Sequence, residues 1–184
     1  MRYFVLALFA LTPALVSNLA LAETSAERAK IYFSDIENGR YAAAVGHFDP
    51  VELKEFRKTM EFYKEIPPQA QAQFVQTFYG ASQTIESLGK ASDVEFFTGL
   101  FNFIMGQADA AGGLSFDGLE ILGEVMEGKN VSHLVIRNRV SVGEIEMEAM
   151  EVISLQKVGK EWRVLMSGKI KGLPQQLEAA FAGQ

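Results

Sequence analysis

Few side chains in this sequence have the types and spacing that acid, base or metal chemistry requires. The two histidines, His47 and His133, lie far apart in the chain, and neither is flanked by other ligand residues at metal-binding spacing. The absence of cysteine excludes thiol catalysis and cysteine-based metal sites. GxSxG, Walker and dinucleotide-binding motifs are absent as well. We therefore expect no metal ion, no cofactor and no catalytic histidine.

Glu151 is the one carboxylate whose predicted position gives it a chemical role. The strand alternation places it on the sheet face that packs against helices, opposite Leu134 and Gly168. Burying a carboxylate there costs several kcal/mol unless it is paired, hydrated or protonated. Two interpretations stay open. A β-bulge at 149–151 would turn the side chain outward, whereas a cavity would let it act as the acid or base of a small isomerase or hydrolase.

The elements that must position these residues begin with a helical half, predicted over residues 24–107. Thr24 to Glu27 and Ser92 to Glu95 each form a capping box, and Asp49 followed by Pro50 marks another helix start. The helix opened at Ser92 has an unusually wide apolar stripe, which indicates either deep burial or a helix that covers a cavity. The stripe consists of Phe96, Phe97, Leu100, Phe101, Ile104 and Met105.

From residue 114 the apolar period changes from 3.6 to 2, which predicts a sheet over 114–170 followed by a helix over 173–181. The predicted antiparallel strands are 119–127, 131–140, 144–158 and 162–170. A turn at Val142-Gly143 would pair Arg139 with Glu146 and Arg137 with Glu148.

A turn at Gly159-Lys160 would pair Leu155 with Val164, Ile153 with Met166 and Lys157 with Trp162. The sequence therefore predicts an α+β domain in which N-terminal helices pack on a curved four-stranded antiparallel sheet.

The first 22 residues predict a cleavable secretory signal peptide. Arg2 is followed by an apolar stretch that is too short to span a bilayer, and Ala20-Leu21-Ala22 is a small-x-small cleavage pattern. We expect cleavage between Ala22 and Glu23, a single mature domain over 23–184, and a periplasmic or secreted location.

The net negative charge of the chain limits the kinds of macromolecule that it is expected to bind. The chain carries a net charge of −6 and has no basic cluster, and loss of Arg2 with the signal makes the mature domain more acidic still. This balance argues against binding to nucleic acid and to anionic membrane surfaces. No second segment is long and apolar enough for stable membrane insertion.

The order of these elements resembles the NTF2-like (cystatin-like, α+β cone) superfamily, in an exported bacterial form. The resemblance rests on the opening helix over 26–39, the segment 41–50 after it, and the ending 152–165, in which a strand, a glycine turn and a Trp-Arg strand follow one another. It implies a pocket between sheet and helices, and often a homodimer through the outer sheet face.

These expectations combine into a functional hypothesis. We expect a non-catalytic exported domain that binds an apolar or amphipathic small molecule, a lipid being one version, or a protein partner. The candidate ligand-binding residues are Glu151, Phe97, Phe101, Ile104, Met105 and Met147. Two alternatives remain: a small isomerase or hydrolase that uses Glu151, and a structural interaction module with a filled core.

Overall fold

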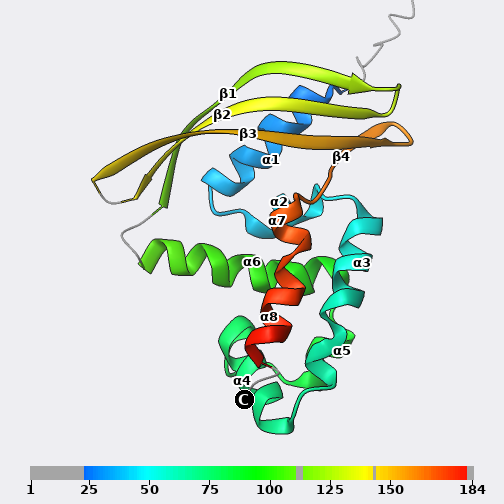
Figure 1. The fold of residues 1–184 in the computed structure, drawn as a ribbon, viewed down its shortest axis with the longest axis vertical. Coiled ribbons are helices and arrows are strands. Elements are labelled where there is room, and N and C mark those ends of the chain that lie inside the picture. Colours follow the sequence, from blue (N-terminus) through cyan, green and yellow to red (C-terminus); the bar gives the residue numbers. More distant parts are fainter. Residues whose placement is uncertain (1–22, 111–113, 143, 182–184) are drawn as a thin grey trace, which may run out of the picture.

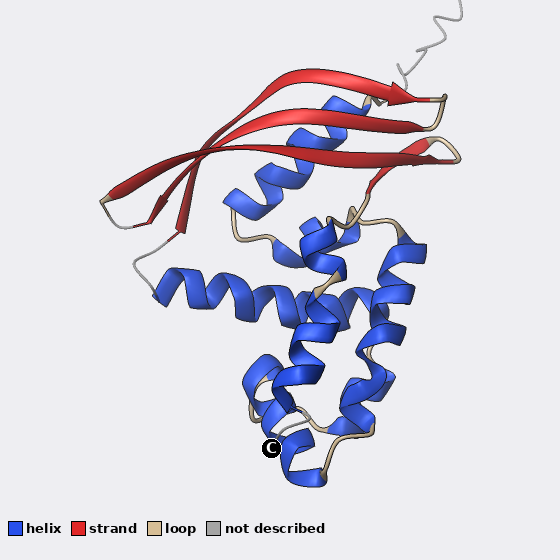
Figure 2. Cartoon of the chain, in the orientation of Figure 1, coloured by secondary structure: helices blue, strands red, loops and turns tan. Residues whose placement is uncertain are grey.

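The computed structural model describes residues 23–110, 114–142 and 144–181, so the predicted signal peptide lies outside the described residues. Figures 1 and 2 show a curved sheet on one side and a group of helices on the other. The helices are α1 (Ser25–Glu37), α2 (Tyr41–Gly46), α3 (Pro50–Thr59), the 3-10 helix η1 (Met60–Lys64), α4 (Pro68–Tyr79), α5 (Ile85–Lys90), α6 (Asp93–Ala110), α7 (Gly168–Lys171) and α8 (Leu173–Phe181). The predicted α+β fold is confirmed.

The sheet has the strand order β1 (Leu114–Glu127), β2 (Val131–Val142), β3 (Ile145–Val158) and β4 (Glu161–Val164). All neighbours are antiparallel, as the sequence predicts. The inner face buries alternate residues, among them Leu134, Ile136 and Leu155. Two register shifts fall in β1, between Phe116 and Gly118 and between Ile121 and Gly123. Irregularities of this kind bend the strand that carries them and increase its twist.

The predicted pairing of β2 with β3 is wrong by two residues. Val142 pairs with Ile145, so the connection lies between these two residues and not at Val142-Gly143. Arg139 therefore faces Glu148, and Ser141 faces Glu146. A shift of two leaves every side chain on its expected face, because the side-chain period of a strand is also two. Charge and apolar alternation fix the face of a strand and not its position along the partner.

The last predicted strand, 162–170, is too long. Leu155 pairs with Val164 and Lys157 with Trp162, as expected, but β4 ends at Val164. The chain turns away there because Val164 bonds to the helical half: its N–H donates to His47 O at 2.8 Å, and its carbonyl accepts from Asp49 N at 2.9 Å. The residues that follow form α7, so Gly168 is not a strand neighbour of Glu151.

α1 lies directly under the sheet (Figure 1). The predicted capping box at its start is confirmed, since the Thr24 side chain accepts from Glu27 N and the Glu27 side chain accepts from Thr24 N. Ala29 and Tyr32 are buried on the side of the core. Ser25 Oγ donates to Glu124 Oε1 of β1 at 2.5 Å, which ties the start of the helix to the sheet.

A second layer of helices, α3 to α6 with α8, lies farther from the sheet (Figure 1). Its core is aromatic: Phe74 stacks on Tyr63 at 5.4 Å between ring centroids and meets Phe181 of α8 edge-on at 5.5 Å. Such pairs contribute about 0.5–1.5 kcal/mol beyond the area that they bury. The C-terminal helix is therefore part of the core of this layer.

Arg57 of α3 is buried in the same layer. Its guanidinium donates to Leu88 O and to Ala91 O, both at 2.8 Å, and lies 4.5 Å from the centroid of the Phe96 ring. These carbonyls belong to the end of α5, where a helix leaves its last C=O groups without partners. Arg57 thus fixes the end of α5 against α3 and the start of α6.

Candidate functional site

Three of the residues predicted to bind a ligand are buried or partly buried in the core. Phe97 is buried and meets Phe48 and Phe56 edge-on, with centroids 5.5 Å and 4.9 Å away. Phe101 is partly buried against this cluster, and Tyr41 meets it edge-on. Met105 is buried as well. The rings of Phe97 and Phe101 therefore pack against other aromatic side chains of the protein.

The other three predicted residues are exposed and come from different places. Ile104 on α6 is 45% exposed and Met147 on β3 is 48% exposed. Glu151 lies on the helix-facing side of β3 opposite Ile136, where its side chain is about half exposed and 3.9 Å from Lys169 Nζ. No register shift falls in the β2–β3 ladder at Glu151, so its exposure does not come from a bulge. Solvent reaches it because β4 ends before this part of β3.

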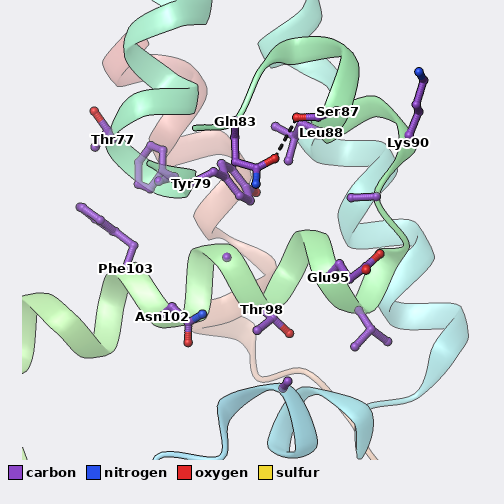
Figure 3. Close-up of a pocket in the computed structure, with 15 residues that line it drawn as sticks. Thr77, Tyr79, Gln83, Ser87, Leu88, Lys90, Glu95, Thr98, Asn102 and Phe103 are labelled. Carbon is purple, nitrogen blue, oxygen red and sulfur yellow. Dashed lines mark hydrogen bonds between the residues drawn. The ribbon is translucent and has the colours of Figure 1, made fainter. Parts of the chain in front are cut away.

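A groove of about 830 Å³ lies elsewhere, along the exposed side of α6 where α4, α5 and α2 border it (Figure 3). This volume is within the usual range of small-molecule sites, roughly 300–1,000 Å³. Two small residues border this space: Ala91, which precedes α6, and Ala42 on α2. Thr98 and Asn102 are four residues apart on α6, so they lie on the same face of the helix and both line the groove.

The lining of the groove is mixed in character. Its aromatic surface comes from Phe78, Tyr79 and Phe103, and the rings of Phe78 and Phe103 meet edge-on at 4.7 Å. Its neutral polar groups are Thr77, Gln83, Ser87, Thr98 and Asn102, and Ser87 Oγ donates to Gln83 Oε1 at 2.8 Å. One cation and one anion, Lys90 and Glu95, are also present. The groove can therefore hold an aromatic or aliphatic body and hydrogen-bond to its polar groups.

Two hydroxyls at the groove have unused hydrogen-bonding capacity. Thr98 Oγ1 and Tyr79 Oη are buried, and neither has a hydrogen-bond partner among the described residues. Burial raises the pKa of Tyr79, with a further contribution from Tyr63, so the phenol is a neutral donor at physiological pH. The Tyr79 ring lies where a Cβ of residue 99 would stand, only 2.3 Å from that position. Gly99 is thus required for the ring to form this wall.

His47 belongs to a polar cluster that the sequence does not reveal. Its Nδ1 lies 2.9 Å from Arg28 Nη1 and its Nε2 lies 2.7 Å from Asp35 Oδ2. Arginine can only donate, so Nδ1 accepts and the proton of a neutral His47 is on Nε2. Burial opposes the charge on Asp35, but hydrogen bonds from His47 and Arg40 outweigh it and lower the pKa of Asp35. Both ring nitrogens are engaged, so the cluster joins α1 to the end of α2 and leaves no free base.

His133 lies between Ser154 and Glu127 on the outer face of the sheet. Its Nδ1 is 2.8 Å from Ser154 Oγ and its Nε2 is 3.1 Å from Glu127 Oε2. The order serine, histidine, carboxylate is that of a hydrolytic triad. The Glu127 side chain is 76% exposed, however, so the cluster lacks the desolvated setting in which such groups gain catalytic strength. We interpret it as a cross-strand polar contact.

In the part of the chain that the structure describes, no group of three or more histidine, aspartate or glutamate side chains is placed to hold a metal ion. Over the same residues, no helix has the length and apolar character needed to cross a membrane.

Comparisons with known proteins add little to this geometry. No protein-family model matches the chain, and no curated protein has a significant match to it. Among solved structures, the chain is similar to a Campylobacter jejuni protein named as an NTF2-like transpeptidase, with 17% sequence identity and a TM-score of 0.27. The match covers 62% of this chain and 94% of the other.

Proposed function

We propose that this chain is an exported, non-catalytic domain of the NTF2-like type, and that it binds an amphipathic small molecule in the groove along α6. The observation that carries the proposal is the groove itself: about 830 Å³, with an aromatic wall and neutral hydrogen-bonding groups. A concave site with apolar surface and a few convergent polar groups is the usual form of a small-molecule site.

The polar groups favour an amphipathic ligand over a purely apolar one. A hydrocarbon in the groove would cover Gln83, Ser87 and Asn102 without replacing the water that solvates them, which costs free energy for each group. A ligand with hydroxyl, amide or carbonyl groups restores those hydrogen bonds and can also engage the buried hydroxyl of Thr98. Its body would contact Phe78 and Phe103.

Export and self-association belong to the same proposal. Cleavage between Ala22 and Glu23 would leave a mature chain whose first ordered contacts are local, because Glu23 pairs with Arg28 at 2.6 Å and Thr24 caps α1. The proposed location is periplasmic or secreted. The outer sheet face exposes Val125, at 62%, together with Met150 and Val152 of β3, which supports a homodimer through this face.

Ala42→Phe tests the groove, because Ala42 is an exposed residue of α2 that lines it. Ala43→Phe is the matched control, since Ala43 is exposed on the same helix and does not line the groove. Native mass spectrometry of protein purified from its own host should show a bound molecule in the parent and in Ala43→Phe, and none in Ala42→Phe. All three should melt within about 2 °C of one another in ligand-free form.

A bound molecule that survives Ala42→Phe would place the ligand elsewhere and contradict the proposed site. Intact mass tests the export proposal separately: the envelope protein should begin at Glu23, and a soluble envelope protein that keeps Met1 would contradict it.

A further inference from the structure

The first half of β3 forms an open edge of the sheet. β4 pairs only with Leu155–Val158. Among the residues that the structure describes, β3 from Ile145 to Ile153 therefore has no strand on the edge that faces away from β2. Figure 2 shows this part of β3 extending well beyond β4. A free edge presents a row of backbone N–H and C=O groups that can pair with another chain.

The hydrogen bonds at the end that pairs with β4 identify which residues of β3 direct their backbone N–H and C=O groups toward the open edge. Ser154 O accepts from Leu165 N on the β4 side at 2.8 Å, while Lys157 N donates toward Asn130 O on the β2 side at 2.7 Å. Successive residues of a strand direct their backbone groups to opposite sides. The N–H and C=O groups of Glu146, Glu148, Met150 and Val152 therefore face the open side.

The side chains along this edge combine acidic and apolar groups. Ile145 and Met147 lie on the helix-facing side, and Met150 and Val152 lie on the outer face; all four are exposed. Glu146 and Glu148 are on the outer face with Met150. Glu148 pairs with Arg137 at 3.0 Å and with Arg139 at 3.6 Å, whereas Glu146 has no basic group within 4 Å in the described part of the chain.

This charge pattern selects against a second copy of the same edge. An antiparallel pair of β3 edges brings the acidic stretch of one chain close to that of the other, in a protein whose net charge is already −6. Like charges in facing positions destabilise a strand pair. Lys169 approaches Glu151, at 3.9 Å, and Arg137 and Arg139 pair with Glu148, so among the described residues of this edge Glu146 is the carboxylate without an ion pair.

We propose that the β3 edge between Ile145 and Ile153 binds an extended, basic segment of a partner protein by strand addition. The added strand is held by backbone hydrogen bonds to the four residues whose N–H and C=O groups face the open edge, namely Glu146, Glu148, Met150 and Val152. Lysine or arginine side chains of the partner lie beside Glu146 on the outer face, and its apolar side chains lie beside Ile145 and Met147 on the helix-facing side. Alternate basic and apolar residues in the partner match this arrangement.

A fluorescent peptide of about eight residues, alternating lysine and valine, is a suitable probe because its length matches the open edge at about 3.3 Å per residue. Fluorescence anisotropy with the purified protein should show saturable binding that weakens with added salt. The same peptide with alternate backbone amides methylated should bind at least about tenfold more weakly, since it cannot complete the ladder. A glutamate-valine peptide should bind more weakly than either.

Two variants test the edge itself. Glu146→Lys should weaken binding of the lysine-valine peptide about tenfold and strengthen binding of the glutamate-valine peptide. Met150→Pro removes an N–H that points to the open side and so leaves the β2–β3 ladder intact, whereas Met150→Val keeps it. We expect loss of binding only in the proline variant. Equal binding of the methylated and unmethylated peptides would overturn the proposal. A dimer by analytical ultracentrifugation that Met150→Pro converts to monomer and Met150→Val does not would overturn it as well.

Discussion

Arg57 offers a direct test of how the groove is built. Replacing it by methionine keeps most of the aliphatic stem and removes the guanidinium. Two 2.8 Å hydrogen bonds, to Leu88 O and Ala91 O, are lost, together with the contact over Phe96. The carbonyls at the end of α5 then have no donor from α3.

The expected cost follows from these contacts. A hydrogen bond from a charged group contributes about 1.5–3 kcal/mol, and a desolvated cation–π contact adds about 1–2 kcal/mol. Removing the buried charge recovers some desolvation free energy, so we expect a net loss of about 3–4 kcal/mol. For a domain of this size that corresponds to a melting temperature lower by roughly 10 °C. The free energy of unfolding of Arg57→Lys should lie between those of the parent and Arg57→Met, because one ammonium cannot reach both carbonyls in the planar geometry of a guanidinium.

Urea unfolding is the appropriate assay, with Trp162 as its fluorescent probe because it is the single tryptophan of the chain and is buried. Lys58→Met is the matched control, since Lys58 is the next residue of α3 and is exposed. It should change the free energy of unfolding by less than about 0.5 kcal/mol. If Arg57→Met lowers the free energy of unfolding no more than Lys58→Met does, Arg57 does not hold α5 in place.

Three other substitutions probe separate contacts. Gly99→Ala should cost about 1–3 kcal/mol, because the new Cβ would stand 2.3 Å from the Tyr79 ring, whereas Gly106→Ala on the same helix has open space and should stabilise; equal effects in thermal melts would contradict the close packing. The lowered pKa of Asp35 contributes stability above its unfolded pKa of about 3.9, and that contribution is lost as pH falls through the folded value. Asp35→Asn should therefore cost about 2 kcal/mol at pH 7 and flatten the acid side of the stability–pH curve; an unchanged acid slope would refute this. Glu151→Gln should alter the free energy of unfolding by less than about 0.5 kcal/mol, and a larger change in urea titrations would mean that the carboxylate has a structural partner.

The features that sequence predicted well are those set by local chemistry. Both capping boxes and the Asp49-Pro50 helix start are present, because a hydroxyl or carboxylate next to the first helical N–H groups acts within a few residues. The faces of the strands are also as expected, since the alternation needs only neighbouring residues. The glycine turn at Gly159 gave the correct β3–β4 register for the same reason.

The features that sequence missed depend on contacts between distant segments. β4 stops at Val164 because that residue bonds to His47 and Asp49, and no pattern around Val164 records this. Arg57 reads as a solvated charge on α3 until α5 is placed beside it. The groove along α6 depends on Gly99, which in sequence is only an unfavourable helix residue. The wide apolar stripe of α6 did indicate burial, but the space lies on the other side of that helix.

The bonds between Val164 and the segment at His47 to Asp49 also bear on the timing of folding. They join segments that are more than 100 residues apart in the chain, and the contact of Phe181 with Phe74 spans a similar separation. Contacts of such long sequence separation form slowly, because the intervening chain must first lose entropy. While the chain emerges from the ribosome, the helical half lacks β4 and α8, so its packing is completed only after these two elements have been synthesised.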